Sequence, residues 1–200
     1  VPLVVLGEQS PARSFDHVGV DNVAAARSAT EHLLGLGRRG IATIGAQPHL
    51  ANSTADQRTA GFRLAVEAAG LPPDDTYAAD VRTLHRNDGA EAMRRLLDES
   101  PDIGSVFCFT DELALGAIRA AYERGLHVPD DLAIVGFDDI EDGRFSIPSL
   151  TTIAPDKALV ATRAVELLED RLRDPSAQSR REVTPYQLIE RESTGVTERP

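Results

Sequence analysis

The chain has 200 residues, of which 42% are hydrophobic, and it carries a net charge of −11 at pH 7. That length and apolar content suffice to bury a core, whereas the acidic charge argues against these residues gripping a nucleic-acid backbone, which needs clustered Lys and Arg. The lone cysteine, Cys108, excludes an internal disulfide and a zinc site built from cysteines. No apolar run approaches the roughly 20 residues of a membrane span, and we expect the natural N-terminus to lie upstream because the chain opens on Val1 rather than Met.

Short apolar runs alternate with helical patterns from the start of the chain to residue 137. Asp21 precedes the first helical pattern as an N-cap, and Gly35 and Gly37 follow it as stop signals. The runs do not alternate polar and apolar residues, which is typical of strands covered on both faces, so we predict an α/β fold with a parallel sheet flanked by helices. The predicted strands span 1–7, 41–45, 76–81, 105–109 and 132–137, and the predicted helices span 22–37, 55–69, 89–100 and 111–125.

The regular alternation ends after Phe137. We expect residues 138–152 to form a long irregular stretch, followed by a helix from about 155 to 172. A polar linker over 174–181 then leads to a segment, 181–193, that is typical of an edge strand. This tail need not belong to the same sheet as the strands before it.

The carboxyl ends of the predicted strands mark where a ligand would bind. Ligands of open parallel sheets lie there because loops and helix N-termini converge at that edge. We therefore expect one cleft lined by side chains from five places: 7–9, 46–54, 81–88, 110–111 and 137–139.

Several of these residues have a structural explanation as well as a functional one. Asp138 and Asp139 either turn the chain at a strand end or bind a ligand. A catalytic pair is disfavoured, because the side chains of adjacent residues diverge and a shared proton needs two carboxylates that face each other. Thr110 or Asp111 is expected to cap the helix that follows. Arg58 lies in the first turn of its helix, where a cation opposes the helix dipole. Such an arginine either has a partner that is anionic or offers several acceptor atoms, or it is simply exposed to solvent.

The sequence contains no pattern typical of catalysis or cofactor binding. Its five histidines lack the spacing of metal ligands, and Cys108 lies in the apolar run SVFCF without a nearby basic residue, as a buried structural thiol would. The glycine-rich phosphate and dinucleotide motifs and the GxSxG nucleophile turn are all missing. We therefore expect no enzyme activity, no cofactor and no metal.

A series of segments follows in a distinctive order: VGVDN and EHLLGLGRRGIATIG, then RTAGFRLAVEAAGL and AMRRLL, then FTDELALGAIRAAYERGLHVPDDLAIVGFDDIEDGRFSIPSLTTI and LIERESTG. In this order and spacing they resemble the effector-binding core of LacI/GalR-family transcriptional regulators, which share a fold with periplasmic sugar-binding proteins. The resemblance implies a periplasmic-binding-protein-like type I fold whose first subdomain is only partly present.

The resemblance also implies how the chain is divided. Residues 1–9 would be the last strand of the N-terminal subdomain with a crossover, 10–150 the C-terminal effector-binding subdomain, and 151–200 a return crossover with a helix and strand of the N-terminal subdomain. It further implies a cytoplasmic homodimer, with helix 113–122 at the dimer surface, that binds DNA through an N-terminal helix-turn-helix absent from this chain. The alternative is a periplasmic or extracellular solute-binding protein of a sugar transporter.

In such regulators a small-molecule effector, a sugar or related metabolite, lies between the two subdomains. By resemblance, Arg58 grips the ligand, Asp138 accepts from its hydroxyl or N–H groups, and Thr54 is a small polar residue on the same loop as Arg58. The expected effector-binding residues are Arg58, Asp138, Thr54, Thr110, Val81 and Asp111.

Four positions depart from the pattern of this family. Thr110 stands where many members have Asn, Gly7 where many have an acid, and Lys157 where some have an apolar or aromatic residue. Val81 removes an aromatic platform on which sugar rings often stack. We therefore expect the frame of the pocket to be retained and its sugar-contacting details to differ.

Overall fold

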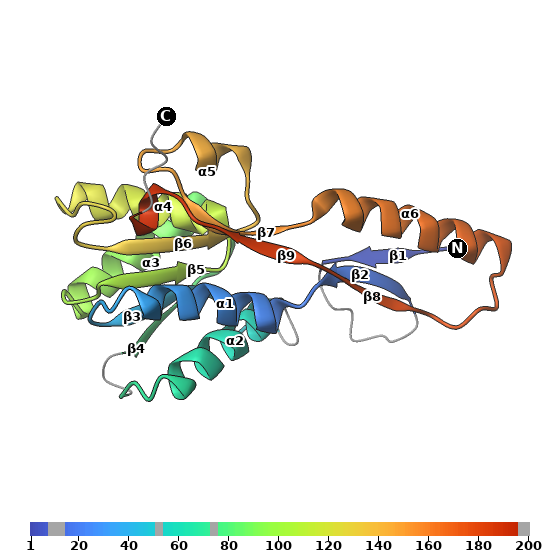
Figure 1. Ribbon diagram of the computed structural model, residues 1–200, viewed down its shortest axis with the longest axis horizontal. Helices are drawn as coiled ribbons and strands as arrows, with labels where there is room; N and C mark the ends of the chain where they lie inside the picture. Colours follow the sequence, from blue (N-terminus) through green and yellow to red (C-terminus); the bar gives the residue numbers. More distant parts are fainter. Residues whose placement is uncertain (8–14, 51–53, 73–75, 196–200) are drawn as a thin grey trace.

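The computed structural model describes residues 1–7, 15–50, 54–72 and 76–195, which form a large and a small lobe (Figure 1). The large lobe holds a six-stranded sheet in the order β4-β3-β5-β6-β7-β9, and the small lobe holds a three-stranded sheet in the order β1-β2-β8. The chain passes between the lobes where β2 leads into α1, where β7 leads into α6 and where β8 leads into β9.

The large sheet is parallel except at one edge, where β9 pairs antiparallel with β7. Every residue of β5 and β6 is buried, which explains the nearly continuous apolar runs SVFC and AIVGF. The predicted parallel sheet flanked by helices is therefore confirmed. Its strands are β3 (Ile41–Ala46), β4 (Thr76–Asp80), β5 (Ser105–Cys108), β6 (Ala133–Phe137), β7 (Thr151–Pro155) and β9 (Tyr186–Ile189).

The helices of the large lobe pack in pairs, α1 against α2 and α3 against α4. Glycines permit this close approach, because a Cβ at Gly116 would lie 2.0 Å from the Arg86 carbonyl oxygen and one at Gly61 would lie 2.3 Å from that of Val23. Across the described ranges, each helix is too short or too polar to cross a membrane. The helices are α1 (Asn22–Gly35), α2 (Thr54–Ala68), α3 (Arg86–Glu99), α4 (Asp111–Glu123) and the short α5 (Glu141–Phe145).

The small lobe is a parallel sheet of β1 (Val4–Leu6), β2 (Asp16–Val20) and β8 (Arg181–Thr184), with α6 (Lys157–Arg173) packed on it. Inside it, Arg171 of α6 donates two hydrogen bonds, of 2.9 and 3.1 Å, to the Asp16 carboxylate, which is 1% exposed. The Arg180 backbone N–H donates to the same carboxylate at 2.7 Å. One buried acid thus ties β2 to α6 and to the segment before β8.

Some strands lie in the other lobe from the one that the expected subdomain boundaries assign to them. β2 lies in the small sheet although residues 10–150 were expected in the other subdomain, and β7 and β9 lie in the large sheet although 151–200 were expected to return to the first. The segment 181–193 forms two strands in different sheets, separated by Pro185, and then a 3-10 turn over Glu192–Thr194. A proline lacks the N–H that a continuous strand would donate, so it suits this break.

One further expectation needs correction. The stretch 138–152, predicted to be irregular, contains α5 and the first residues of β7. The expected dimer surface on 113–122 stays a prediction; of the apolar side chains there, Leu113 and Ala117 are fully buried and Tyr122 is largely exposed. The apolar pattern of α4 is therefore explained first by its packing on α3 and on the sheet.

Gly116→Ala is expected to lower the free energy of unfolding by about 1–3 kcal/mol, because the added methyl group would force α4 away from α3. Gly35→Ala is the matched control, since no atom lies within 4 Å of a Cβ at that helical position. Urea unfolding followed by circular dichroism measures both variants. Equal stability of the two would contradict the close α3–α4 contact.

Candidate functional site

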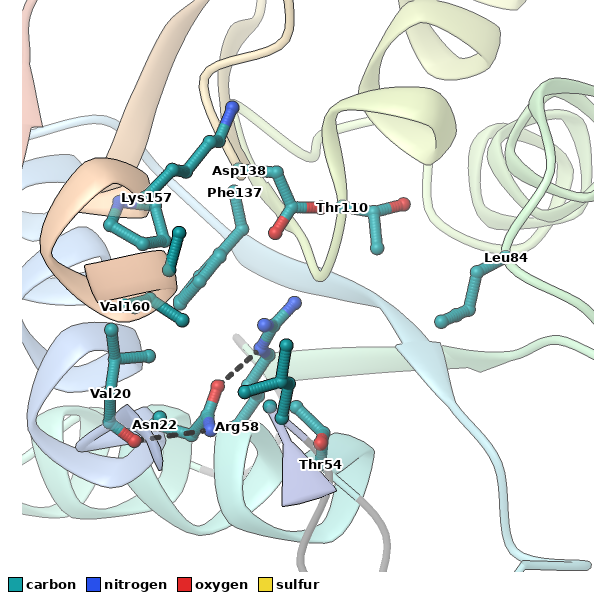
Figure 2. Close-up of a pocket in the computed structure, with 15 residues that line it drawn as sticks. Val20, Asn22, Thr54, Arg58, Leu84, Thr110, Phe137, Asp138, Lys157 and Val160 are labelled. Atoms are coloured by element: carbon teal, nitrogen blue, oxygen red, sulfur yellow. Dashed lines mark hydrogen bonds between the residues drawn. The ribbon is translucent and has the colours of Figure 1, made fainter. Parts of the chain in front are cut away.

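A cavity of about 510 Å³ lies at the junction of the lobes (Figure 2). Each of the five places predicted from the strand ends supplies part of its lining: Gly7, Thr54, Leu84, Thr110, and Phe137 with Asp138. Other parts of the chain supply the remaining residues: Leu6, Gly19, Val20, Asn22, Arg58, Pro155, Lys157, Val160 and Ala161. The strand-end rule therefore predicted the position of the cavity correctly.

Arg58 is a buried cation, 8% exposed, that three groups from different elements hold in place. Its Nε donates to the Oδ1 of Asn22 at 2.9 Å, and its Nη1 donates to the backbone carbonyl oxygen of Phe109. The guanidinium carbon lies 3.5 Å from the centre of the Phe137 ring, a cation–π contact. Among the described residues Nη2 has no hydrogen-bond partner, so this nitrogen remains available to a ligand.

Asp138 lines the cavity, and its carboxylate points toward the part of the cavity that holds Arg58 (Figure 2). In the part of the chain that the structure describes, no ion pair joins the two side chains. Burial lowers the pKa of Arg58 to about 10, an effect that Asp138 and Asp111 oppose, so the guanidinium stays charged at neutral pH. Burial raises the pKa of Asp138 above its ordinary value, and Arg58 and Lys157 act against this. A hydroxyl group placed between them can donate to the carboxylate and accept from the guanidinium.

The adjacent acids Asp138 and Asp139 have different surroundings. Asp139 accepts hydrogen bonds of 2.6 Å from both Arg144 and Arg191. Burial acts to raise the pKa of Asp139, but these two arginines outweigh it and hold that pKa below its ordinary value. Both acids have positive φ, 113° and 49°, so the dipeptide is also the turn that ends β6. Asp139 has a structural role, and Asp138 is the acid that faces the cavity.

Two threonines at helix starts offer hydroxyl groups. Thr54 begins α2, and its hydroxyl oxygen is buried without a hydrogen-bond partner among the described residues. Thr110 caps α4, because its hydroxyl oxygen accepts from the Leu113 backbone N–H at 3.2 Å, so the predicted N-cap is this residue rather than Asp111. A threonine hydroxyl that accepts one hydrogen bond still has a proton to donate. Both residues line the cavity and can therefore contact a ligand.

Asp111 and Val81, both expected at the effector site, do not line the cavity. Asp111 is fully buried and accepts from the Thr152 hydroxyl at 2.6 Å and the Ile140 N–H at 2.8 Å, so it fixes the chain after β6. Val81 is 6% exposed and packs in the apolar core of the large lobe. Their place at the strand ends was predicted correctly, but the direction of each side chain depends on backbone geometry that residue type does not reveal.

The effector-binding residues predicted from the sequence did not include Asn22. They also did not include the apolar lining from the small lobe and α6, notably Val20 and Val160. The signal for Asn22 was its position directly after the helix cap at the end of β2, a strand that the local pattern did not predict. The cavity as built offers hydrogen-bonding groups and apolar surface. Over the described ranges, no group of three His, Cys, Asp or Glu side chains is placed to hold a metal ion.

Two α/β lobes with a partly polar cavity at their junction define the class as a ligand-binding domain of the periplasmic binding protein-like type. The periplasmic binding protein-like domain family matches residues 30–194. A solved structure described as a LacI-family transcriptional regulator from Sanguibacter keddieii DSM 10542 is 47% identical, with a TM-score of 0.90, over 98% of this chain and 72% of that one. The chain belongs to the LacI family of transcriptional regulators and corresponds to its effector-binding domain.

Two further relatives carry regulator names. The chain is 36% identical over 193 residues to the HTH-type transcriptional repressor PurR of Haemophilus influenzae (strain PittEE), covering 94% of this chain and 56% of that protein. It is 33% identical to the structure of a transcriptional regulator CelR–cellobiose complex, with a TM-score of 0.85, over 96% of this chain and 59% of that one. The chain spans about half the length of the curated relatives it matches.

Asp111 is expected to make stability depend on pH. Burial raises its pKa to about 7 from 3.8, so between these values the folded state keeps a proton that the unfolded state has lost. Unfolding then releases a proton, and the free energy of unfolding falls as the pH rises from about 4 to about 7, by on the order of 2–4 kcal/mol.

Asp111→Asn should remove this slope, because an amide can accept from the Ile140 N–H and donate to the Thr152 hydroxyl without titrating. The control is Glu112→Gln, which neutralises the adjacent acid on the exposed side of α4. Urea unfolding at several pH values gives the comparison. If wild type and Asp111→Asn share the same pH profile, the buried carboxyl does not hold its proton as described.

Proposed function

We propose that the chain is the effector-sensing and dimerisation core of a LacI-type DNA-binding regulator that acts in the cytoplasm. A small molecule, a sugar or related metabolite, binds between the lobes and controls operator affinity. DNA is contacted by a helix-turn-helix segment that is not among these residues. The observation that carries the proposal is the buried Arg58 guanidinium at the cavity, fixed on three sides and with one amino group that has no hydrogen-bond partner among the described residues.

The cavity suits a switch because both lobes contribute to its lining. Leu6, Gly19 and Val20 come from the small sheet, whereas Arg58 and Asp138 come from the large lobe. A ligand that contacts both lobes more fully in one relative arrangement favours that arrangement by its difference in binding free energy. A coupling of about 1–3 kcal/mol, typical of allosteric proteins, changes DNA affinity roughly 5- to 150-fold.

The relatives support this class of ligand and partner. The CelR structure contains cellobiose, and a LacI-family regulator from Enterococcus faecium with 29% identity and a TM-score of 0.86 contains ribose. For this chain, the paired donor and acceptor groups of Arg58 and Asp138 fit a hydroxyl-bearing ligand, since a hydroxyl both accepts and donates. The named regulators and repressors among the relatives favour control of transcription over transport.

The homodimer that we propose would use the exposed apolar surface next to α5. Phe145 and Ile147 are 78% and 93% exposed, although large apolar side chains rarely gather at the surface without a partner. α5, which ends at Phe145, lies on the side of the large lobe opposite to α2 (Figure 1). A second copy of the chain that covers this surface would remove both side chains from water.

Arg58→Lys is expected to weaken sugar binding at least about tenfold, because a lysine ammonium cannot keep both hydrogen bonds and the stacked contact with Phe137. Arg63→Lys makes the same change on the exposed face of α2 and should leave affinity unchanged. Calorimetric titration with a panel of neutral mono- and disaccharides measures both variants. Binding that is indifferent to Arg58→Lys would contradict the proposed site.

Phe145→Glu is expected to shift the chain from dimer to monomer, since the new charge would have to be buried in the subunit contact. The control is Leu64→Glu, which places the same charge on the half-exposed side chain of α2. Sedimentation velocity over a range of concentrations distinguishes the two states. A Phe145→Glu protein that remains dimeric, or a wild-type chain that is monomeric throughout, would refute this dimer surface.

A further inference from the structure

Among the described residues, the polar side chains of the cavity lie on one wall, with the exception of Lys157 of α6. Asn22, Thr54, Arg58, Thr110 and Asp138 come from the strand ends and helix starts of the large lobe. Of these, Asn22 is partly occupied, because its Oδ1 accepts from Arg58 and one N–H of its Nδ2 donates to the Val20 carbonyl oxygen at 3.4 Å. Apart from Lys157, the hydrogen-bonding side chains that a ligand meets form a single edge.

In the part of the chain that the structure describes, the facing wall is apolar except for Lys157. It is formed by Leu6, Gly19 and Val20 of the small sheet with Val160 and Ala161 of α6. Figure 2 shows Val20 and Val160 on one side of the space around Arg58, with Leu84 on the other side. A ligand hydroxyl directed at these side chains would lose its water without gaining a hydrogen bond, which weakens binding.

The polar edge sets one cation, Arg58, against one carboxylate, Asp138, and the positive charge of Lys157 also acts on Asp138. Lys157, the other cation of the lining, donates to the Asp139 carbonyl oxygen at 3.0 Å, and its ammonium points away from Arg58 (Figure 2). Anions are usually gripped by a fork of two guanidinium donors, but Nε and Nη1 of Arg58 are already bonded within the protein.

We infer that the ligand group held between the Arg58–Asp138 edge and α6 belongs to a neutral deoxy sugar, with hydroxyls along one edge and C–H surface toward Val20 and Val160. This inference rests on the proposed function and narrows its ligand class. A fully hydroxylated sugar would leave a hydroxyl unpaired against the apolar wall. A sugar phosphate would add negative charge beside Asp138 without a free fork of donors.

Matched sugar series test the inference by calorimetric titration of the chain. One series is D-glucose, 2-deoxy-D-glucose, 6-deoxy-D-glucose and D-glucose 6-phosphate; the second contains the corresponding galactose compounds, with D-fucose as the 6-deoxy member; the third is D-ribose, 2-deoxy-D-ribose and D-ribose 5-phosphate. In at least one series a deoxy member should bind about tenfold or more tightly than its parent, and the phosphates should show no binding.

A variant of the apolar wall gives a second, independent readout. Val160→Asn places a hydrogen-bonding group opposite the polar edge and should shrink or reverse the preference for the deoxy member. Val165→Asn makes the same change on the exposed face of α6 and should leave that preference intact.

The outcomes separate this inference from the proposed function. If parent sugars bind as tightly as their deoxy forms, or Val160→Asn leaves the preference unchanged, while binding still depends on Arg58, the deoxy-sugar inference fails and the sensing role stands. Tightest binding of a phosphate also overturns the inference. Absence of binding throughout the three series counts against both.

Discussion

Burial of the Arg58 guanidinium is the constraint on which the rest of the site depends. A charge removed from water destabilises a fold by several kcal/mol unless hydrogen bonds and opposite charges replace the lost solvent. Here the replacement comes from Asn22 at the start of α1, Phe109 after β5 and Phe137 at the end of β6. Because these residues are far apart in sequence, the cation is satisfied only when the strand ends have assembled in their correct order.

The same region also connects the two lobes. Lys157, at the start of α6, donates to the Asp139 carbonyl oxygen in the large lobe, and the carboxylate of Asp139 is held by Arg191, two residues after β9. Asp138, the cavity acid, is the preceding residue, and its φ of 113° is a strained value that the surrounding bonds maintain. A ligand at Asp138 is therefore adjacent to segments that pass between the lobes, where small shifts can change their relative orientation.

Local sequence patterns were sufficient for the features that depend on neighbouring residues. Buried parallel strands carry apolar runs, helix caps such as Asp21 precede their helices, and strand ends gather on one edge of a parallel sheet, so the sheet and the cavity were predicted. Features set by distant partners were missed. β2 pairs with β1 and β8, whose residues come from opposite ends of the chain, and the inward direction of Val81 and Asp111 depends on the backbone geometry of their strand ends.

The central claim is that one ligand bridges Arg58 and Asp138 across a gap that the protein does not close itself. A double-mutant cycle with Arg58→Lys and Asp138→Asn tests this directly, using the tightest-binding neutral sugar and calorimetric titration. If one ligand bridges the two side chains, the two losses in binding free energy are coupled by about 1 kcal/mol or more. Losses that add to within about 0.5 kcal/mol, or a single variant that binds as well as wild type, would contradict it.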